Sequence, residues 1–244
     1  MTCFLDLFSG IGGFALGAHW AGLKFDKHYF SEVDEYAIKV YKKRFSEAIT
    51  VGDINRICFA DLPKGRWLVA GGFPCQDIST AGRGEGLAGS RSNLWFAMQR
   101  VVRHLQPDFV VIENVGALVR QGLETVLFTL AKIGYDAEWQ DIRASDVGAP
   151  HKRERIWIVA YPKCERWPWR TDSQAERNVQ GRDEIAGCSS DGAESQWAVE
   201  PDVGRVAHGI PSRVHRLKCL GNAVVPQIPK LLFRRIKELW ADAS

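Results

Sequence analysis

The sequence lacks the cysteine spacings that build metal sites and disulfide scaffolds. Its six cysteines include no pair separated by two residues, so neither a zinc site, another metal centre nor a disulfide framework is expected. It also has no apolar run long enough to span a bilayer, and Met1 leads straight into a strand-like segment with no basic leader. Thiols without such a framework fit a reducing compartment. We therefore expect a soluble, cytoplasmic protein with no membrane partner.

A strong excess of one charge is missing as well. The 244 residues include 32 basic and 29 acidic side chains, for a net charge of +3, which alone does not indicate a nucleic-acid partner. The length suits one α/β domain with a small appendage. Strand-like apolar runs alternate with helical periods, so we expect an α/β fold with a doubly wound, mostly parallel, Rossmann-like sheet.

The first glycine-rich turn has no third glycine of the dinucleotide-binding kind. A strand over residues 3–8 leads into Gly10, Gly12 and Gly13, which open a helix. Ala15 occupies the region of the third glycine, which disfavours a nicotinamide or flavin cofactor. Bare backbone at a helix N-terminus still suits a ligand, and a plain tight turn is the alternative.

Acidic residues follow the next predicted strands. Glu32 comes after a strand over residues 27–31, at the place where such folds hold a ribose hydroxyl pair. Asp53 follows a short apolar stretch in the same way. Acids at successive strand ends favour one adenosine-sized ligand, although Asp34 and Asp53 are equally suited to capping helices.

Cys75 stands beyond another strand, over residues 66–70. Gly72 lets the backbone approach a neighbour closely, and Pro74 stiffens the turn before the sulfur. Ligands of open α/β sheets bind beyond the carboxyl ends of the strands, so this thiol is expected to face a crevice. A buried structural cysteine is the alternative.

A long glycine-rich loop follows Cys75 and carries Ser79, Arg83 and Arg91. We expect it to close over phosphates, with an unengaged surface loop as the alternative. Farther on, an apolar strand over residues 108–112 ends in Glu113, on the same edge as Cys75. Glu113 is equally suited to capping a helix.

Two arginines precede the strand over residues 156–160. Alternation places Arg153 and Arg155 on one face of an extended segment, with a solvated strand start as the alternative.

The composition changes after residue 162. Residues 163–205 hold six basic and nine acidic side chains and few aliphatic ones, which predicts an irregular insert. Its tryptophans either wedge into DNA or pack the insert onto the domain, and packing is favoured. The following stretch to residue 218 is basic and contains no acid, which suits phosphate contacts. Asn222 then precedes a terminal helix, over about residues 227–240, either as a cap or as a ligand contact.

In their order, these motifs closely resemble the DNA cytosine-C5 methyltransferase family. The resemblance covers roughly residues 1–160 and 204–240 and departs at two positions, where Val33 replaces a common Trp and His151 the usual Gln. It is carried by the segments Asp6–Gly13, Glu32, Gly52–Ile54, Gly71–Gln76, Glu113–Val115, Arg153 with Arg155, and Gly221–Pro226.

The resemblance implies a class I methyltransferase that uses S-adenosylmethionine on double-stranded DNA. It divides the chain into a catalytic and cofactor-binding domain (1–162), a reduced target-recognition insert (163–204) and a segment that completes the domain (205–244). Its implied catalytic residues are Cys75 as the nucleophile, Glu113, Arg153 and Arg155. Its implied cofactor contacts are Phe8, Gly10, Gly12, Gly13, Glu32, Val33, Asp53, Ile54, Pro74, Leu94, Asn222 and Ala223. Its implied DNA contacts are Ser79, Arg83, Arg91, Arg213, Arg216 and Lys218.

The chemistry explains why these groups are needed. Cytosine C5 is a poor nucleophile, and addition of the Cys75 thiolate to C6 activates it. Arg155 is expected to stabilise charge at O2, and a protonated Glu113 charge at N3. The base has to leave the duplex for this reaction. Two alternatives are methylation of cytosine in tRNA and a homologue that binds cofactor and DNA without turnover. The compact chain suits a phage or prophage enzyme acting in a bacterial or infected host cell.

Overall fold

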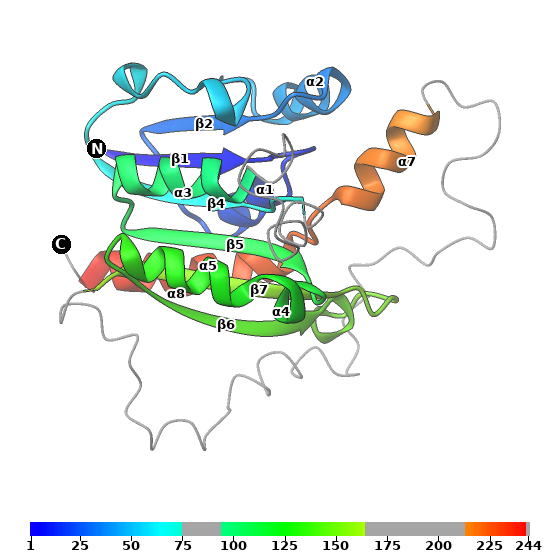
Figure 1. Cartoon of the computed structure of the whole chain (residues 1–244). Coiled ribbons are helices and arrows are strands. Elements are labelled where there is room, and N and C mark those ends of the chain that lie inside the picture. Colours follow the sequence, from blue (N-terminus) through cyan, green and yellow to red (C-terminus); the bar gives the residue numbers. More distant parts are fainter. Residues whose placement is uncertain (75–93, 164–212, 243–244) are drawn as a thin grey trace, which may run out of the picture.

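The computed structural model in Figure 1 describes residues 1–74, 94–163 and 213–242. Cys75, Ser79, Arg83, Arg91 and nearly all of the predicted insert lie outside the described residues. The roles predicted for these residues therefore stay predictions. Within the described part, a central sheet is covered by helices on both faces (Figure 1).

The sheet has seven strands in the order β3-β2-β1-β4-β5-β7-β6. Parallel pairing joins β3 (Ile49–Thr50), β2 (Lys27–Ser31), β1 (Thr2–Leu7), β4 (Arg66–Gly71) and β5 (Phe109–Val115). β7 (Glu154–Pro162) runs antiparallel between β5 and β6 (Tyr135–Arg143). The chain winds outward from β1 to β3 and then returns to β4, so the strand order reverses between β1 and β4. This confirms the doubly wound, mostly parallel sheet, whose ligands bind at such a switch point.

The alternation of side chains along the strands supplies two apolar layers. Leu5 and Val69 belong to a core with α3 and α5, whereas Phe4 and Leu68 belong to a core with α1 and α8. Both layers are closed to water, which is why the central strands are apolar on both faces. The helices are α1 (Gly13–Trp20), α2 (Glu35–Arg44), α3 (Leu94–Leu105), α4 (Leu118–Gln121), α5 (Leu123–Lys132), α7 (Arg213–Asn222) and α8 (Gln227–Asp242). Short 3-10 turns are η1 (Ile54–Arg56), η2 (Phe59–Asp61) and η5 (Ala144–Val147).

Helix α7 was not expected from the sequence, and its side chains over 214–222 are exposed apart from the partly buried Cys219. The ring of His215 stacks on Tyr36, with centroids 5.5 Å apart, and Lys218 pairs with Asp34. The opposite side carries Val214, Leu217 and Leu220, which are exposed by 74%, 44% and 53%. A helix that buries no apolar stripe against the domain lacks the core-facing pattern from which helices are predicted. Among the described residues, no helix has the length and apolar character needed to cross a membrane.

Three further boundaries differ from the sequence expectation. Glu113 lies inside β5, which continues to Val115, rather than beyond its end. β3 ends at Thr50, so Asp53 follows a connecting turn instead of a strand. The sequence also predicts a helix from about Gln121 to Lys132; in the structure α5 begins at Leu123, and Gln121 ends the short helix α4.

Candidate active site

A cavity of about 630 Å³ opens beyond the carboxyl ends of the parallel strands. It is the cavity expected at the switch point of such a sheet. Residues predicted from the sequence for catalysis, cofactor binding and DNA binding line it together. They are Phe8, Gly10, Glu32, Val33, Asp53, Ile54, Pro74, Leu94, Glu113, Arg153, Arg155, Lys218 and Asn222.

Glu32 joins the glycine turn to the end of β2. Its Oε2 accepts a hydrogen bond from the Gly10 amide at 2.8 Å. Its Oε1 accepts from the amides of Val33 at 2.8 Å and Asp34 at 2.9 Å. An ionised carboxylate accepts about four hydrogen bonds, so Glu32 keeps capacity for one more donor in the cavity. This arrangement suits a ligand hydroxyl group.

The turn before α1 uses unusual backbone geometry. Phe8 has φ +53° and Gly10 has φ +52°, both in the left-handed region. A non-glycine residue there costs on the order of 1 kcal/mol. The fold carries this energetic cost at a position where Phe8 lines the cavity.

Asp34 and Asp53 both cap helical turns, as the alternative interpretation expected. Asp34 Oδ1 accepts from the amides of Tyr36 at 3.0 Å and Ala37 at 3.2 Å, at the start of α2. Its other oxygen lies 2.8 Å from Lys218 Nζ, and this hydrogen bond lowers the pKa of Asp34. Asp53 Oδ1 accepts from the Asn55 amide at 2.9 Å. Both carboxylates also line the cavity, so capping and ligand contact are compatible.

Glu113 and Arg155 form a largely buried ion pair in the cavity wall. Arg155 Nε lies 3.0 Å from Glu113 Oε1, and their side chains are 22% and 13% exposed. Burial raises the pKa of Glu113, although the positive charges of Arg155 and Arg153 oppose the shift. The site thus favours a proton on Glu113 more than water does. Gly72, just before the cysteine segment, approaches this pair so closely that a Cβ there would lie 2.8 Å from Glu113 Oε2.

Arg153 connects the start of β7 to the C-terminal motif. It donates to the carbonyl oxygens of Gly221 and Ala223, both at 2.9 Å. Burial lowers its pKa, and the nearby charge of Arg155 acts in the same direction. Arg153 therefore holds the chain beside Asn222 against the start of β7.

Asn114 is a site residue to which the sequence analysis assigned no role. It is buried, and its Nδ2 donates to the Phe73 carbonyl oxygen at 2.8 Å. This bond fixes the segment that leads to Cys75 onto β5. A polar residue next to Glu113 near the end of an apolar strand was the available signal, but its partner is 41 residues away.

Three predicted cofactor residues lie behind the cavity wall. A Cβ on Gly12 would meet the Phe45 ring at 2.9 Å, and one on Gly13 would meet Val224 Cβ at 2.8 Å. Ala223 offers its carbonyl to Arg153. Their observed contacts are with protein, and their contact with a cofactor stays a prediction.

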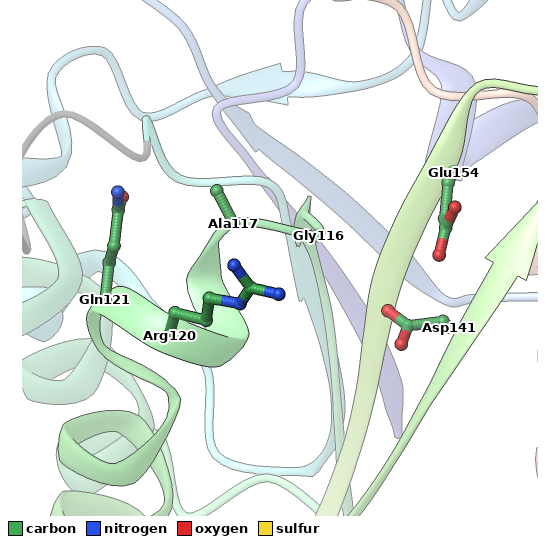
Figure 2. Close-up of a pocket in the computed structure, with 6 residues that line it drawn as sticks. All are labelled: Gly116, Ala117, Arg120, Gln121, Asp141 and Glu154. Carbon is green, nitrogen blue, oxygen red and sulfur yellow. The ribbon is translucent and has the colours of Figure 1, made fainter.

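A second cavity, of about 470 Å³, is lined by residues of α4 and of the antiparallel strands (Figure 2). Arg120 and Gln121 of α4 stand on one side of it, and Asp141 and Glu154 of the antiparallel strands stand on the other. Glu154 belongs to this cavity whereas its neighbour Arg155 belongs to the first, as alternation along β7 requires. No predicted site residue lines the second cavity within the described part of the chain.

The first cavity fits an adenosine-bearing methyl donor. Glu32 and Asp53 supply acceptors for hydroxyl or amino groups, while Phe8 and Ile54 supply apolar surface. Across residues 1–74, 94–163 and 213–242, no group of three or more His, Cys, Asp or Glu side chains is placed to hold a metal ion.

The sheet and its switch-point cavity define a Rossmann-like fold of the class I methyltransferase type. A structure described as a DNA modification methyltransferase encoded within an E. coli prophage aligns with a TM-score of 0.55 and 28% identity, covering 67% of this chain and 47% of that one. The fold is also that of Spodoptera frugiperda DNMT2, with a TM-score of 0.60, 21% identity, and coverage of 71% and 54%.

The chain belongs to the C-5 cytosine-specific DNA methylase family, whose family model matches residues 2–196. Enzymes of this family use S-adenosylmethionine as the methyl donor. The type II methyltransferase M1.ScrFI of Lactococcus lactis subsp. cremoris is 38% identical over 163 residues, which cover 65% of this chain and 41% of that protein. M.NgoBI of Neisseria gonorrhoeae is 40% identical over 161 residues, covering 64% and 50%. The chain thus spans half or less of the length of these curated relatives.

Proposed function

We propose that the protein transfers a methyl group from S-adenosylmethionine to C5 of a flipped-out cytosine in double-stranded DNA. One observation carries the proposal. Glu113 and Arg155, which suit a pyrimidine ring, line the same cavity as Gly10 and Glu32, which suit the methyl donor. Membership in the cytosine-specific methylase family supports the same reaction. In this proposal Cys75, the residue after the cavity-lining Pro74, is the nucleophile.

The reaction begins when the Cys75 thiolate adds to C6 of cytosine and the electron pair of the C5–C6 bond moves into the ring. S-adenosylmethionine, when bound, supplies an electrophilic methyl group on its sulfonium. C5 forms a bond to that methyl group as the methyl–sulfur bond breaks, so that the neutral thioether S-adenosylhomocysteine leaves. A base then removes the C5 proton, and the electrons left behind form the C5=C6 double bond and expel the Cys75 thiolate from C6. N3 returns its proton to Glu113, which restores the cytosine ring and the enzyme.

Glu113 and Arg155 stabilise the charge that builds up during thiolate addition. Glu113 donates a proton to N3, and its raised pKa favours the protonated form that this step needs. Arg155 donates to O2, and Arg153 supports it from the same wall. Because Glu113 and Arg155 already contact each other at 3.0 Å, little reorganisation is needed when the base arrives.

DNA supplies the cytosine in this proposal, and the base is extruded at a cost of roughly a few kcal/mol. Arg213 and Arg216 are proposed phosphate contacts. Ser79, Arg83 and Arg91, in the loop that follows Cys75 in the sequence, are proposed as further DNA contacts. The segment 163–204 is the proposed target-recognition insert, between the catalytic domain and the segment that completes it. No metal enters the proposed reaction.

The test is methyl transfer from tritiated S-adenosylmethionine to DNA by the purified protein. Labelled 5-methylcytosine is expected with the natural chain, and none with Cys75→Ala. A DNA strand containing 5-fluorocytosine should trap a covalent adduct, because the fluorine blocks release from C5. A parallel reaction with tRNA separates the two nucleic acids. Labelling of tRNA alone would overturn the DNA proposal, and binding of cofactor and DNA without label or adduct would support the non-catalytic homologue.

A further inference from the structure

A set of buried polar side chains lies beneath the glycine turn and has no part in the proposed chemistry. Tyr41 of α2 donates its hydroxyl hydrogen to Asp6 Oδ2 of β1 at 3.0 Å. The same hydroxyl oxygen lies 2.7 Å from His28 Nε2 of β2. Asp6 and Tyr41 are completely buried. Three elements of the fold therefore meet at one hydroxyl group.

Burial also determines how the hydrogens are arranged. It lowers the pKa of His28 to about 4, so this imidazole is neutral near pH 7. A neutral ring with its hydrogen on Nε2 donates to the Tyr41 oxygen, and the Tyr41 hydrogen then goes to Asp6. Burial raises the pKa of Asp6, while hydrogen bonds from Tyr41 and from the backbone of Ala15 oppose the shift. Asp6 Oδ1 makes no hydrogen bond within the described part of the chain, so Tyr41 is the side-chain donor on which Asp6 depends.

The ring of Tyr41 supports the glycine turn from below. It stacks on Phe30, with centroids 4.2 Å apart, and this stacking fixes its orientation. Gly12, with φ +90°, rests on it: a Cβ there would lie 3.1 Å from Tyr41 Cε2. Two residues before Gly12, Gly10 lines the cavity and donates its amide to Glu32. Any shift of the ring is therefore passed to the backbone that faces the methyl donor.

We propose that Tyr41 is a positioning residue for the cofactor end of the cavity. Its ring supports the turn from Gly10 to Gly13, and its hydroxyl ties that support to Asp6 at the end of β1. The inference rests on the proposed function, because it assigns the turn to the methyl donor. A side chain that holds a binding segment acts on ligand affinity more than on the chemical step.

Tyr41→Phe tests the role of the hydroxyl, because it keeps the ring and removes the bond to Asp6. We expect the Kd of S-adenosylhomocysteine, measured by titration calorimetry, to rise roughly tenfold, the scale on which outer contacts of a ligand site act. The KM for S-adenosylmethionine should rise in parallel. At saturating cofactor, kcat should change by less than about twofold, because the catalytic groups are untouched.

Tyr135→Phe is the matched control for losing a buried tyrosine hydroxyl. Tyr135 is also buried and donates to the Pro107 carbonyl at 2.7 Å, away from the glycine turn. It should lower stability while leaving the affinity for S-adenosylhomocysteine unchanged. Asp6→Asn keeps an acceptor for Tyr41 and should weaken binding less than Tyr41→Phe.

Equal affinity in Tyr41→Phe and the natural chain overturns the inference, and so does an equal loss in the two tyrosine variants. If the natural chain itself binds no S-adenosylhomocysteine, the proposed function fails and the inference falls with it. If the natural chain binds and only the Tyr41 comparison fails, the proposed function stands.

Discussion

Two carboxylates in the wall of the same cavity have opposite electrostatic surroundings. Asp34 lies near the surface, where the hydrogen bond from Lys218 lowers its pKa. Glu113 is removed from water, and burial raises its pKa even though Arg155 touches it. The difference comes from desolvation, which for Glu113 outweighs the attraction of the neighbouring charge. One acid is therefore suited to staying ionised and the other to carrying a proton.

Glu113→Gln should separate proton donation from shape. The amide still offers an N–H to cytosine N3 but has no carboxyl proton, so kcat should fall by about 100-fold. In the natural chain, kcat should also decline as the pH rises through the raised pKa of Glu113. That alkaline decline should disappear in Glu113→Gln. Glu154→Gln, on the same strand but in the second cavity, is the control and should keep both the rate and the profile.

The same pKa shift has a consequence for stability. The folded protein binds the Glu113 proton more tightly than the unfolded chain does. The stabilisation of the folded state that this tighter proton binding provides is fully present below the pKa of Glu113 in the unfolded chain. It is lost as the pH rises through the pKa of Glu113 in the folded protein. An alkaline decline in kcat that persisted in Glu113→Gln would contradict the assignment of Glu113 as the donor.

Asp34 offers a test of capping against ion pairing. Asp34→Asn keeps an oxygen for the amides of Tyr36 and Ala37 but loses the charge toward Lys218. Asp34→Ala loses both. We expect the free energy of unfolding in urea to fall by about 1 kcal/mol for the alanine variant and by less than about 0.5 kcal/mol for the asparagine variant. Equal losses would mean that the ion pair, rather than the cap, stabilises this end of α2.

At the scale of elements, local pattern was enough for the strands. β2 and β4 were predicted from short runs that are followed by an acid or by glycines. The same pattern predicted that Glu32 and Cys75 come after these strands in the sequence. Glu113 was assigned to the correct strand edge, although β5 runs two residues past it. These strands can be recognised in the sequence because both faces of the sheet are buried, which makes the strand residues predominantly apolar.

Contacts between distant segments were beyond the reach of the sequence. The bonds from Arg153 to Gly221 and Ala223 span 68 and 70 residues, and no local pattern records such a pairing. Helix α7 escaped prediction for a different reason, because His215 and Lys218 contact Tyr36 and Asp34 while Val214, Leu217 and Leu220 stay exposed. It therefore lacks the buried apolar stripe by which a helix is recognised in a sequence.

At the crossing of α1 and α8, packing and helix propensity predict opposite effects of a substitution at Gly17 on the free energy of unfolding. A Cβ on Gly17 would lie 2.9 Å from the Pro226 carbonyl oxygen and 3.0 Å from the Lys230 amide. Gly17→Ala should therefore lower the free energy of unfolding by about 1–3 kcal/mol through overpacking, despite a gain of about 1 kcal/mol in propensity.

Gly116→Ala is the control for this experiment, since a Cβ there meets no atom within 4 Å. Its midpoint in urea should stay close to that of the natural chain. A Gly17→Ala variant as stable as the natural chain would show that α8 moves away from α1 at little cost.

At the scale of the whole molecule, charge is nearly balanced and its placement decides what it does. The net charge is +3, and Lys218 already pairs with Asp34. Arg216, on the exposed side of α7, is better placed to meet a phosphate. In the proposed function each residue that contacts a phosphate should carry a measurable share of the salt dependence of DNA binding.

DNA binding measured against salt concentration tests this placement. Arg216→Ala should weaken binding to any sequence and reduce the slope of log K against log salt by about 0.9, the value for one phosphate contact. Lys218→Ala should change the slope less, because its ammonium group is engaged by Asp34. The reverse order would assign the phosphate contact to Lys218.

The cavity wall is assembled from residues as far apart as Phe8 and Asn222. The hydrogen bond from Lys218 to Asp34 closes this wall and joins positions that are 184 residues apart. During synthesis on the ribosome, the N-terminal strands emerge long before the helix that completes this wall. A nascent or prematurely terminated polypeptide therefore lacks the part of the wall that Lys218, Cys219, Gly221 and Asn222 supply, and such fragments should hold a ligand in the cavity less tightly.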